Sequence, residues 1–122
     1  MPKKSSTAID TVLEKTLCTS FFQVIADLSN EKEVEIFFQN LFSEAELSMF
    51  YKRLAIATML DNGHHYEDIK QTLKVSSATI STVAEHLNSR GFRLALQKIR
   101  TEHWAAQWSS KVMQMFGADR TK

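Results

Sequence analysis

The chain has 122 residues, 43% of them apolar, and 15 Lys and Arg against 14 Asp and Glu, which leaves a net charge of +1 at pH 7. Three glycines and one proline are too few for the many turns of a sheet protein, so the composition favours one all-α domain with a modest core. One cysteine excludes an internal disulfide and indicates a reducing, cytoplasmic setting; we expect no membrane span and no signal peptide, because no suitable apolar run is present.

A disordered tail is expected over residues 1–7, followed by a first helix over residues 8–28. One apolar stripe at helical spacing runs along it: Ile9, Val12, Leu13, Leu17, Phe21, Val24 and Leu28. Such a long apolar face needs a surface to lie on, and in a small protein a second chain can supply part of it. Cys18 stands among these apolar residues, so we expect a small buried side chain rather than a reactive thiol.

Asn30 is predicted to cap a second helix over residues 31–42, with Glu33 three residues later as in a capping box. This helix carries five large apolar residues: Val34, Phe37, Phe38, Leu41 and Phe42. Three phenylalanines in six residues are more apolar surface than one small core easily accepts. They either pack across the long helices or lie in an interface.

The same cap signal recurs at Ser43, with Glu46 three residues on, and predicts a third helix that ends near Asn62. Its apolar positions are Leu47, Phe50, Leu54, Ala57 and Leu60, with Met49, Ile56 and Met59 along a second edge. Gly63 is placed to end this helix in a left-handed turn. The adjacent histidines that follow it cannot readily share one ion, and no cysteine or carboxylate completes a ligand set, so no metal site is expected.

Two short helices joined by a tight turn are predicted over residues 66–88. The apolar positions that would pin them together are Ile69, Leu73, Val75, Ile80, Val83 and Leu87. This is the packing of a helix-turn-helix. Small side chains cluster at the start and along the outer face of the second helix: Ser76, Ser77, Ala78, Thr79, Ser81 and Thr82. They suit close approach to phosphates and base edges, although Ser76 or Ser77 is equally an ordinary N-cap.

Charge is unevenly distributed along the chain. Residues 1–47 hold 4 Lys and Arg against 8 Asp and Glu, whereas residues 48–100 hold 8 against 4 and residues 101–122 hold 3 against 2. The basic excess therefore coincides with the predicted helix-turn-helix and its flanks, where phosphate contacts would be made.

A break over residues 88–91 precedes a last predicted helix over residues 92–116, and residues 117–122 form a second tail. The apolar residues of this helix are Leu96, Ile99, Trp104, Trp108, Val112 and Phe116. The tryptophans could anchor a partner helix or line a ligand pocket, but packing against the N-terminal helix is the simpler account. The organisation expected is one helical domain over residues 8–116.

Residues 41–88 resemble the tryptophan-repressor superfamily, and most closely its YerC/YecD branch. The matching features are S-E-A-E at 43–46, R-L-A-I-A-T-M-L-D-N-G at 53–63, Lys70 with Leu73, and A-T-I-S at 78–81. The resemblance implies a six-helix fold, an intertwined homodimer, and two recognition helices in successive major grooves.

The resemblance also locates a corepressor pocket, from which this chain departs. Arg53 matches the first of the two arginines in the tryptophan-binding members, but the second arginine falls at Thr82 and a close-packed glycine falls at Val83. Tryptophan is therefore not expected as the effector, and a different small molecule is left open. Glu67 replaces a basic residue, and Lys74 takes a turn position that often carries glycine.

The leading hypothesis is a sequence-specific regulator that binds double-stranded DNA as a homodimer. Thr79 and Ser81 would read base edges, Ser76 and Ser77 would donate to phosphate, and a basic set would supply general attraction: Lys70, Lys74 and Arg90. The alternative is a helical module that binds a protein partner. An enzyme is the weakest hypothesis, because no catalytic set or phosphate loop is present at a workable spacing, and no cofactor is implied.

Overall fold

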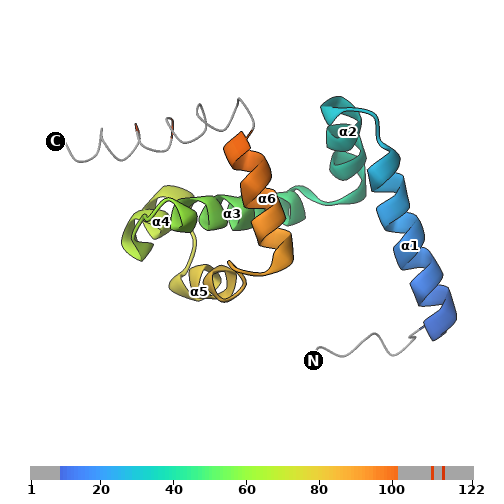
Figure 1. The fold of residues 1–122 in the computed structure, drawn as a ribbon, viewed down its shortest axis with the longest axis horizontal. Coiled ribbons are helices and arrows are strands. Elements are labelled where there is room, and N and C mark those ends of the chain that lie inside the picture. Colours follow the sequence, from blue (N-terminus) through green and yellow to red (C-terminus); the bar gives the residue numbers. More distant parts are fainter. Residues whose placement is uncertain (1–8, 102–110, 112–113, 115–122) are drawn as a thin grey trace. The chain divides into compact units, whose positions relative to one another are not determined.

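The computed structural model describes residues 9–101, 111 and 114. These residues form six α-helices and no strand, which confirms the predicted all-α class (Figure 1). The helices are α1 (Thr11–Asp27), α2 (Glu31–Leu41), α3 (Glu44–Asp61), α4 (Tyr66–Leu73), α5 (Ser77–Glu85) and α6 (Arg90–Thr101). They group into two compact units, the first ending at Glu44 and the second beginning at Ala45.

The first unit contains α1 and α2, and side-chain caps define both helix starts. The Asp10 carboxylate accepts a hydrogen bond from the Val12 N–H at 2.8 Å. At α2, the Asn30 side chain accepts from the Glu33 N–H at 3.0 Å, while the Glu33 carboxylate accepts from the Ser29 N–H at 2.7 Å. The predicted cap at Asn30 is confirmed, and its reciprocal bond goes to Ser29, one residue before the cap.

Aromatic rings join the two helices of this unit. Phe21 of α1 lies 6.4 Å from Phe37 of α2 between ring centroids, and Phe38 lies 5.4 Å from Phe42. These spacings are typical of favourable aromatic pairs. Phe37, Phe38 and Phe42 thus pack on one another in sequence, and Phe37 packs on α1, as one of the two predicted alternatives requires.

Neither α1 nor α2 has a buried residue. The predicted apolar stripe of α1 is largely exposed, with Leu17 at 52%, and Phe22 beside it is 62% exposed. Cys18 is exposed as well, so the prediction of its burial is wrong for the single chain. Helical periodicity places these residues on common faces, but the single chain brings nothing to cover them.

The second unit contains α3 to α6 and has a true core. Seven buried residues from all four helices form it: Ile56, Ala57, Met59, Ile69, Ile80, Val83 and Leu96. Partly buried side chains pack against it: Leu60, Leu73, Val75, Leu87 and Phe92. Six of these positions are those predicted to pin α4 and α5 together. The polar Thr58 is also buried, and its hydroxyl donates to the Leu54 carbonyl at 2.9 Å.

Gly63 ends α3 as predicted. Its φ of 85° is left-handed, the Gly63 N–H donates to the Leu60 carbonyl at 3.0 Å, and the His64 N–H donates to the Met59 carbonyl at 3.0 Å. This pair of bonds is a Schellman motif. Across the unit, Arg100 of α6 binds the Asp61 carboxylate through Nε at 3.1 Å and Nη2 at 2.6 Å, which ties the ends of α3 and α6 together.

The last helix begins earlier than predicted. The Arg93 N–H donates to the Ser89 carbonyl at 2.9 Å, so α6 starts at Arg90 and its first turn includes Gly91. Glycine is tolerated there because no atom lies within 4 Å of where its Cβ would stand, so the missing side chain loses no packing contact. The predicted continuation with Trp104, Trp108, Val112 and Phe116 lies outside the described residues, as do the tails at 1–7 and 117–122. In the part described, no helix is long and apolar enough to cross a membrane.

Candidate nucleic-acid interface

The α4 and α5 helices are joined by a turn of three residues, Lys74 to Ser76. Lys74 has φ 56° and ψ 52°, a left-handed conformation, and its N–H donates to the Lys70 carbonyl at 2.9 Å. Ile69 of α4 and Ile80 of α5 are fully buried on either side of the turn. Fixed packing of this kind holds the second helix at a defined angle to the first.

Ser76 caps α5. Its hydroxyl oxygen accepts from the Thr79 N–H at 3.1 Å and lies 3.0 Å from the Thr79 hydroxyl. The cap interpretation is therefore correct for Ser76. Ser77 is the first helical residue and is exposed, whereas Thr79 is half-buried. Because a hydroxyl has one donor and two acceptor positions, Thr79 keeps hydrogen-bonding capacity beyond its bond to Ser76.

The outer face of α5 is made of small residues. Ala78, Ser81 and Thr82 are exposed, while Ile80 and Val83 on the opposite side are buried. The Thr82 hydroxyl donates to the Ala78 carbonyl at 3.0 Å, so its proton is committed within the helix. Ser77 and Ser81 also have hydroxyl donors on this face. Within the described part of the chain, neither hydroxyl forms a hydrogen bond.

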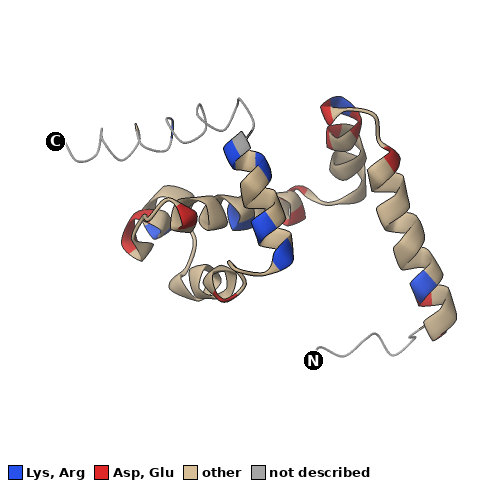
Figure 2. Ribbon diagram, in the orientation of Figure 1, with Lys and Arg blue, Asp and Glu red and all other residues tan. Residues whose placement is uncertain are grey.

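Basic residues stand before and after α5 in the chain. Between Arg90 and Thr101, α6 carries four basic and no acidic residues, as the blue segments in Figure 2 show. Arg90 is exposed at its start, and Lys74 is exposed in the turn. The Lys70 Nζ lies 3.9 Å from Glu67 Oε1, so an acid on the same helix partly neutralises that lysine. Glu67 thus lowers the positive potential of α4.

The three residues predicted for a ligand site lie in different environments. Arg53 on α3 and Thr82 on α5 are exposed, whereas Val83 is 2% exposed and belongs to the core. Sequence reasoning did not single out Glu85, an exposed acid that shares the outer face of α5. Its spacing of four from Ser81 was the available signal. In the described segments no three His, Cys, Asp or Glu residues gather as a metal site would require.

A first prediction concerns Lys74. A left-handed conformation costs a residue with a side chain about 1–2 kcal/mol, and glycine avoids this cost. Glycine also makes the unfolded chain more flexible, which offsets about 0.5–1 kcal/mol of that stabilisation. We expect Lys74→Gly to raise the free energy of unfolding by about 0.5–1 kcal/mol, measured by urea denaturation. Lys74→Ala is the control, because it removes the charge and keeps the backbone cost. A Lys74→Gly protein less stable than Lys74→Ala would contradict the argument.

The sequence of this chain is similar to known proteins. The model of the family described as Trp repressor protein matches residues 16–99, which span α2 to α5 and most of α1 and α6. The chain is also similar to the uncharacterized protein YerC of Bacillus subtilis (strain 168), with 32% identity over 81 residues, 65% of this chain and 78% of YerC. No solved structure matches the chain. The family match covers more than half of the chain, and the chain therefore belongs to the Trp repressor family.

Proposed function

We propose that the protein is a sequence-specific transcriptional regulator that binds double-stranded DNA as a homodimer, with α4 and α5 as its helix-turn-helix. The observation that carries this proposal is the outer face of α5. It presents small exposed residues on a helix whose other face is locked into a core by Ile80 and Val83. A helix of this shape can enter a major groove without bulky side chains holding it away from the bases.

Each predicted contact has a physical basis in this arrangement. Ser81 and Thr79 read base edges, and Ala78 meets a thymine methyl. Ser77 donates to phosphate at the start of α5, where the backbone N–H groups of the helix also favour an anion. Lys74 and two further cations supply attraction that does not depend on sequence: Lys70 and Arg90.

A second copy of the chain would supply the second recognition helix that a full DNA site requires. One recognition helix covers only a few base pairs, whereas two helices about 34–36 Å apart reach successive major grooves. The first unit supports dimerisation, because its two helices bury no residue in the single chain and expose apolar side chains. A unit without buried residues gains its stability from whatever covers it.

Selection of bound duplexes from a random pool at near-physiological salt tests the proposal. We expect one enriched motif with two related half-sites, and affinity for it that falls steeply as salt is added. A second candidate function is a protein-interaction module, which the exposed apolar residues of α1 and α2 favour. Absence of any enriched motif, together with weak binding that ignores sequence, would exclude the regulator and leave the module.

The effector of this regulator is not expected to be tryptophan. A tryptophan pocket requires cations for the carboxylate and close backbone approach, yet Thr82 has no charge and donates its proton to Ala78. Val83 fills core space where a glycine would leave room. We expect L-tryptophan to bind with a dissociation constant poorer than about 1 mM, and DNA affinity to be the same with and without it.

Calorimetry with L-tryptophan measures this directly. The matched variant is Thr82→Arg with Val83→Gly, which restores the arginine and glycine of the tryptophan-binding members and is expected to bind more tightly than the parent. Micromolar binding by the parent protein would show that Arg53 and its neighbours build a pocket of another design.

A further inference from the structure

We propose that Glu85 determines part of the DNA sequence preference, by selecting cytosine at one position of each half-site. The inference rests on the proposed function and adds to it a residue that chooses between bases. Glu85 is the last residue of α5 and is exposed.

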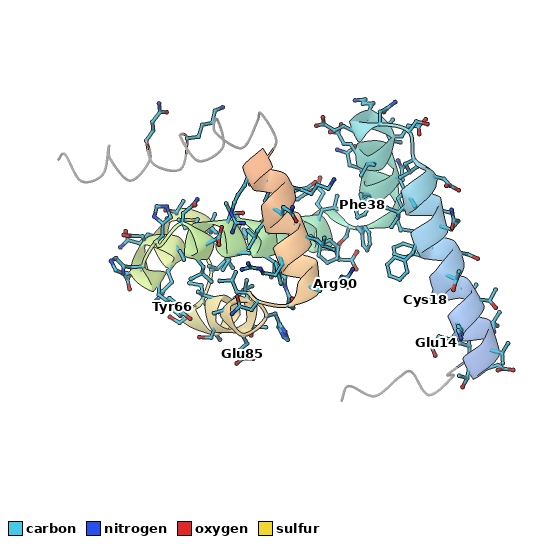
Figure 3. All side chains as sticks on the ribbon, in the orientation of Figure 1. Glu14, Cys18, Phe38, Tyr66, Glu85 and Arg90 are labelled. Atoms are coloured by element: carbon cyan, nitrogen blue, oxygen red, sulfur yellow. The ribbon has the colours of Figure 1, made fainter. Side chains whose placement is uncertain are left out.

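Position places Glu85 on the reading face of the helix. It follows Ser81 by four residues and Thr82 by three, and these spacings bring side chains to one face of a helix. Figure 3 shows Glu85 on the side of α5 that points away from α3. Ile80 and Val83, which face the core, are buried. A side chain on this face would extend the row formed by Ala78 and Ser81 toward the C-terminal end of α5.

Folding does not account for a carboxylate at this position. The C-terminal end of a helix carries partial negative charge, which disfavours an acid there. Glu85 is the only charged residue of α5, and within the described residues it forms no hydrogen bond or ion pair. Near DNA the phosphates would repel it further. A contact between Glu85 and a base would offset the unfavourable interactions with the helix end and with the phosphates.

The chemistry of the carboxylate decides which base. An ionised carboxylate can only accept hydrogen bonds. In the major groove, guanine presents two acceptors and thymine one, so both repel it, and adenine places an acceptor beside its amino group. Cytosine presents an amino donor alone and is the best partner. Serine and threonine hydroxyls both donate and accept, so Glu85 is the most selective group on this face.

The test compares duplex selection by the parent, Glu85→Ala and Glu85→Gln, with Glu67→Gln as the matched control. We expect the parent motif to contain a cytosine that Glu85→Ala no longer selects, a loss of preference of roughly 5- to 150-fold. Glutamine pairs with adenine, so Glu85→Gln should move the preference toward adenine at the same position. Glu67→Gln removes an acid that pairs with Lys70 on α4, and it should strengthen binding to all sequences alike.

The outcomes separate this inference from the function on which it rests. If the parent selects no motif, the proposed function fails and the inference with it. If the parent selects a motif and the Glu85 variants select the same motif, with affinity raised evenly as in Glu67→Gln, only the role of Glu85 is refuted. Circular dichroism of each variant confirms folding, which replacement of an exposed acid at a helix C-terminus should not weaken.

Discussion

Leu17→Lys is expected to convert a dimer into a poorly folded monomer. Leu17 is 52% exposed in the single chain and shares a flank of α1 with Leu13 and Val24, which are also exposed. Fully burying one exposed leucine stabilises by about 1.5–3 kcal/mol, so covering the exposed half of Leu17 contributes about 0.8–1.5 kcal/mol per copy and about 1.5–3 kcal/mol per dimer. Its loss raises the dimer dissociation constant by roughly 10- to 150-fold, and the lysine adds the cost of burying a charge.

Sedimentation equilibrium at micromolar concentration measures the effect. Thr19→Lys is the matched control, because Thr19 is exposed and two residues from Leu17, which places it on nearly the opposite side of α1. The parent and the control should sediment as dimers with equal helix content. A parent protein that is monomeric at this concentration with its fold intact would refute both the dimer and the role assigned to α1.

Hydrophobic periodicity predicted the second unit well, because that unit is closed within one chain. Ile69, Ile80 and Val83 were expected between α4 and α5, and all three are buried. The local signals were equally direct: Gly63 has the left-handed φ that its position after α3 suggested. Caps and turns depend on neighbours in sequence, so one chain contains all the information they need.

The first unit shows where the same reasoning stops. Periodicity identified the apolar stripe of α1 but could not say what covers it, since a stripe looks the same whether its partner is in the same chain or another. Burial of Cys18 was inferred from apolar neighbours in sequence, and the single chain leaves it exposed. The sequence predicts a break at Gly91, whereas α6 begins at Arg90, because an exposed glycine with no packing contact to lose is acceptable in a first turn.

The sequence also does not predict which side chains contact one another in the candidate interface. The spacing of Glu67 and Lys70 permits an ion pair, but their 3.9 Å approach is a property of the folded helix. Likewise, the Thr79 hydroxyl was expected to be available for bases, and it lies 3.0 Å from the Ser76 hydroxyl. Rotamers decide between such alternatives, and sequence patterns do not contain them.

Lys70→Ala and Thr79→Ala are expected to weaken DNA binding in different ways. Lys70 has a flexible, 38% exposed side chain with a point charge, which suits a phosphate and not a particular base. Its loss should weaken operator and random DNA alike. It should also reduce the slope of log affinity against log salt by about 0.9 for each contact, and thus by about 1.8 for a dimer. Fluorescence anisotropy over a range of salt concentrations measures both quantities.

Thr79→Ala should instead cost about 1–3 kcal/mol on the operator, change binding to random DNA little, and leave the salt slope unchanged. Thr79→Ser is the control, because serine keeps the hydroxyl and its bond to Ser76. Serine is smaller than threonine, so it also fits the half-buried position. If Thr79→Ser also loses the operator, the methyl group carries the recognition, through a thymine methyl.

The Ser76 cap bond to the backbone N–H survives both substitutions, so α5 should stay folded and loss of affinity would report the DNA contact itself. Identical losses on operator and random DNA for the lysine and threonine variants would refute the separate roles proposed for α4 and α5.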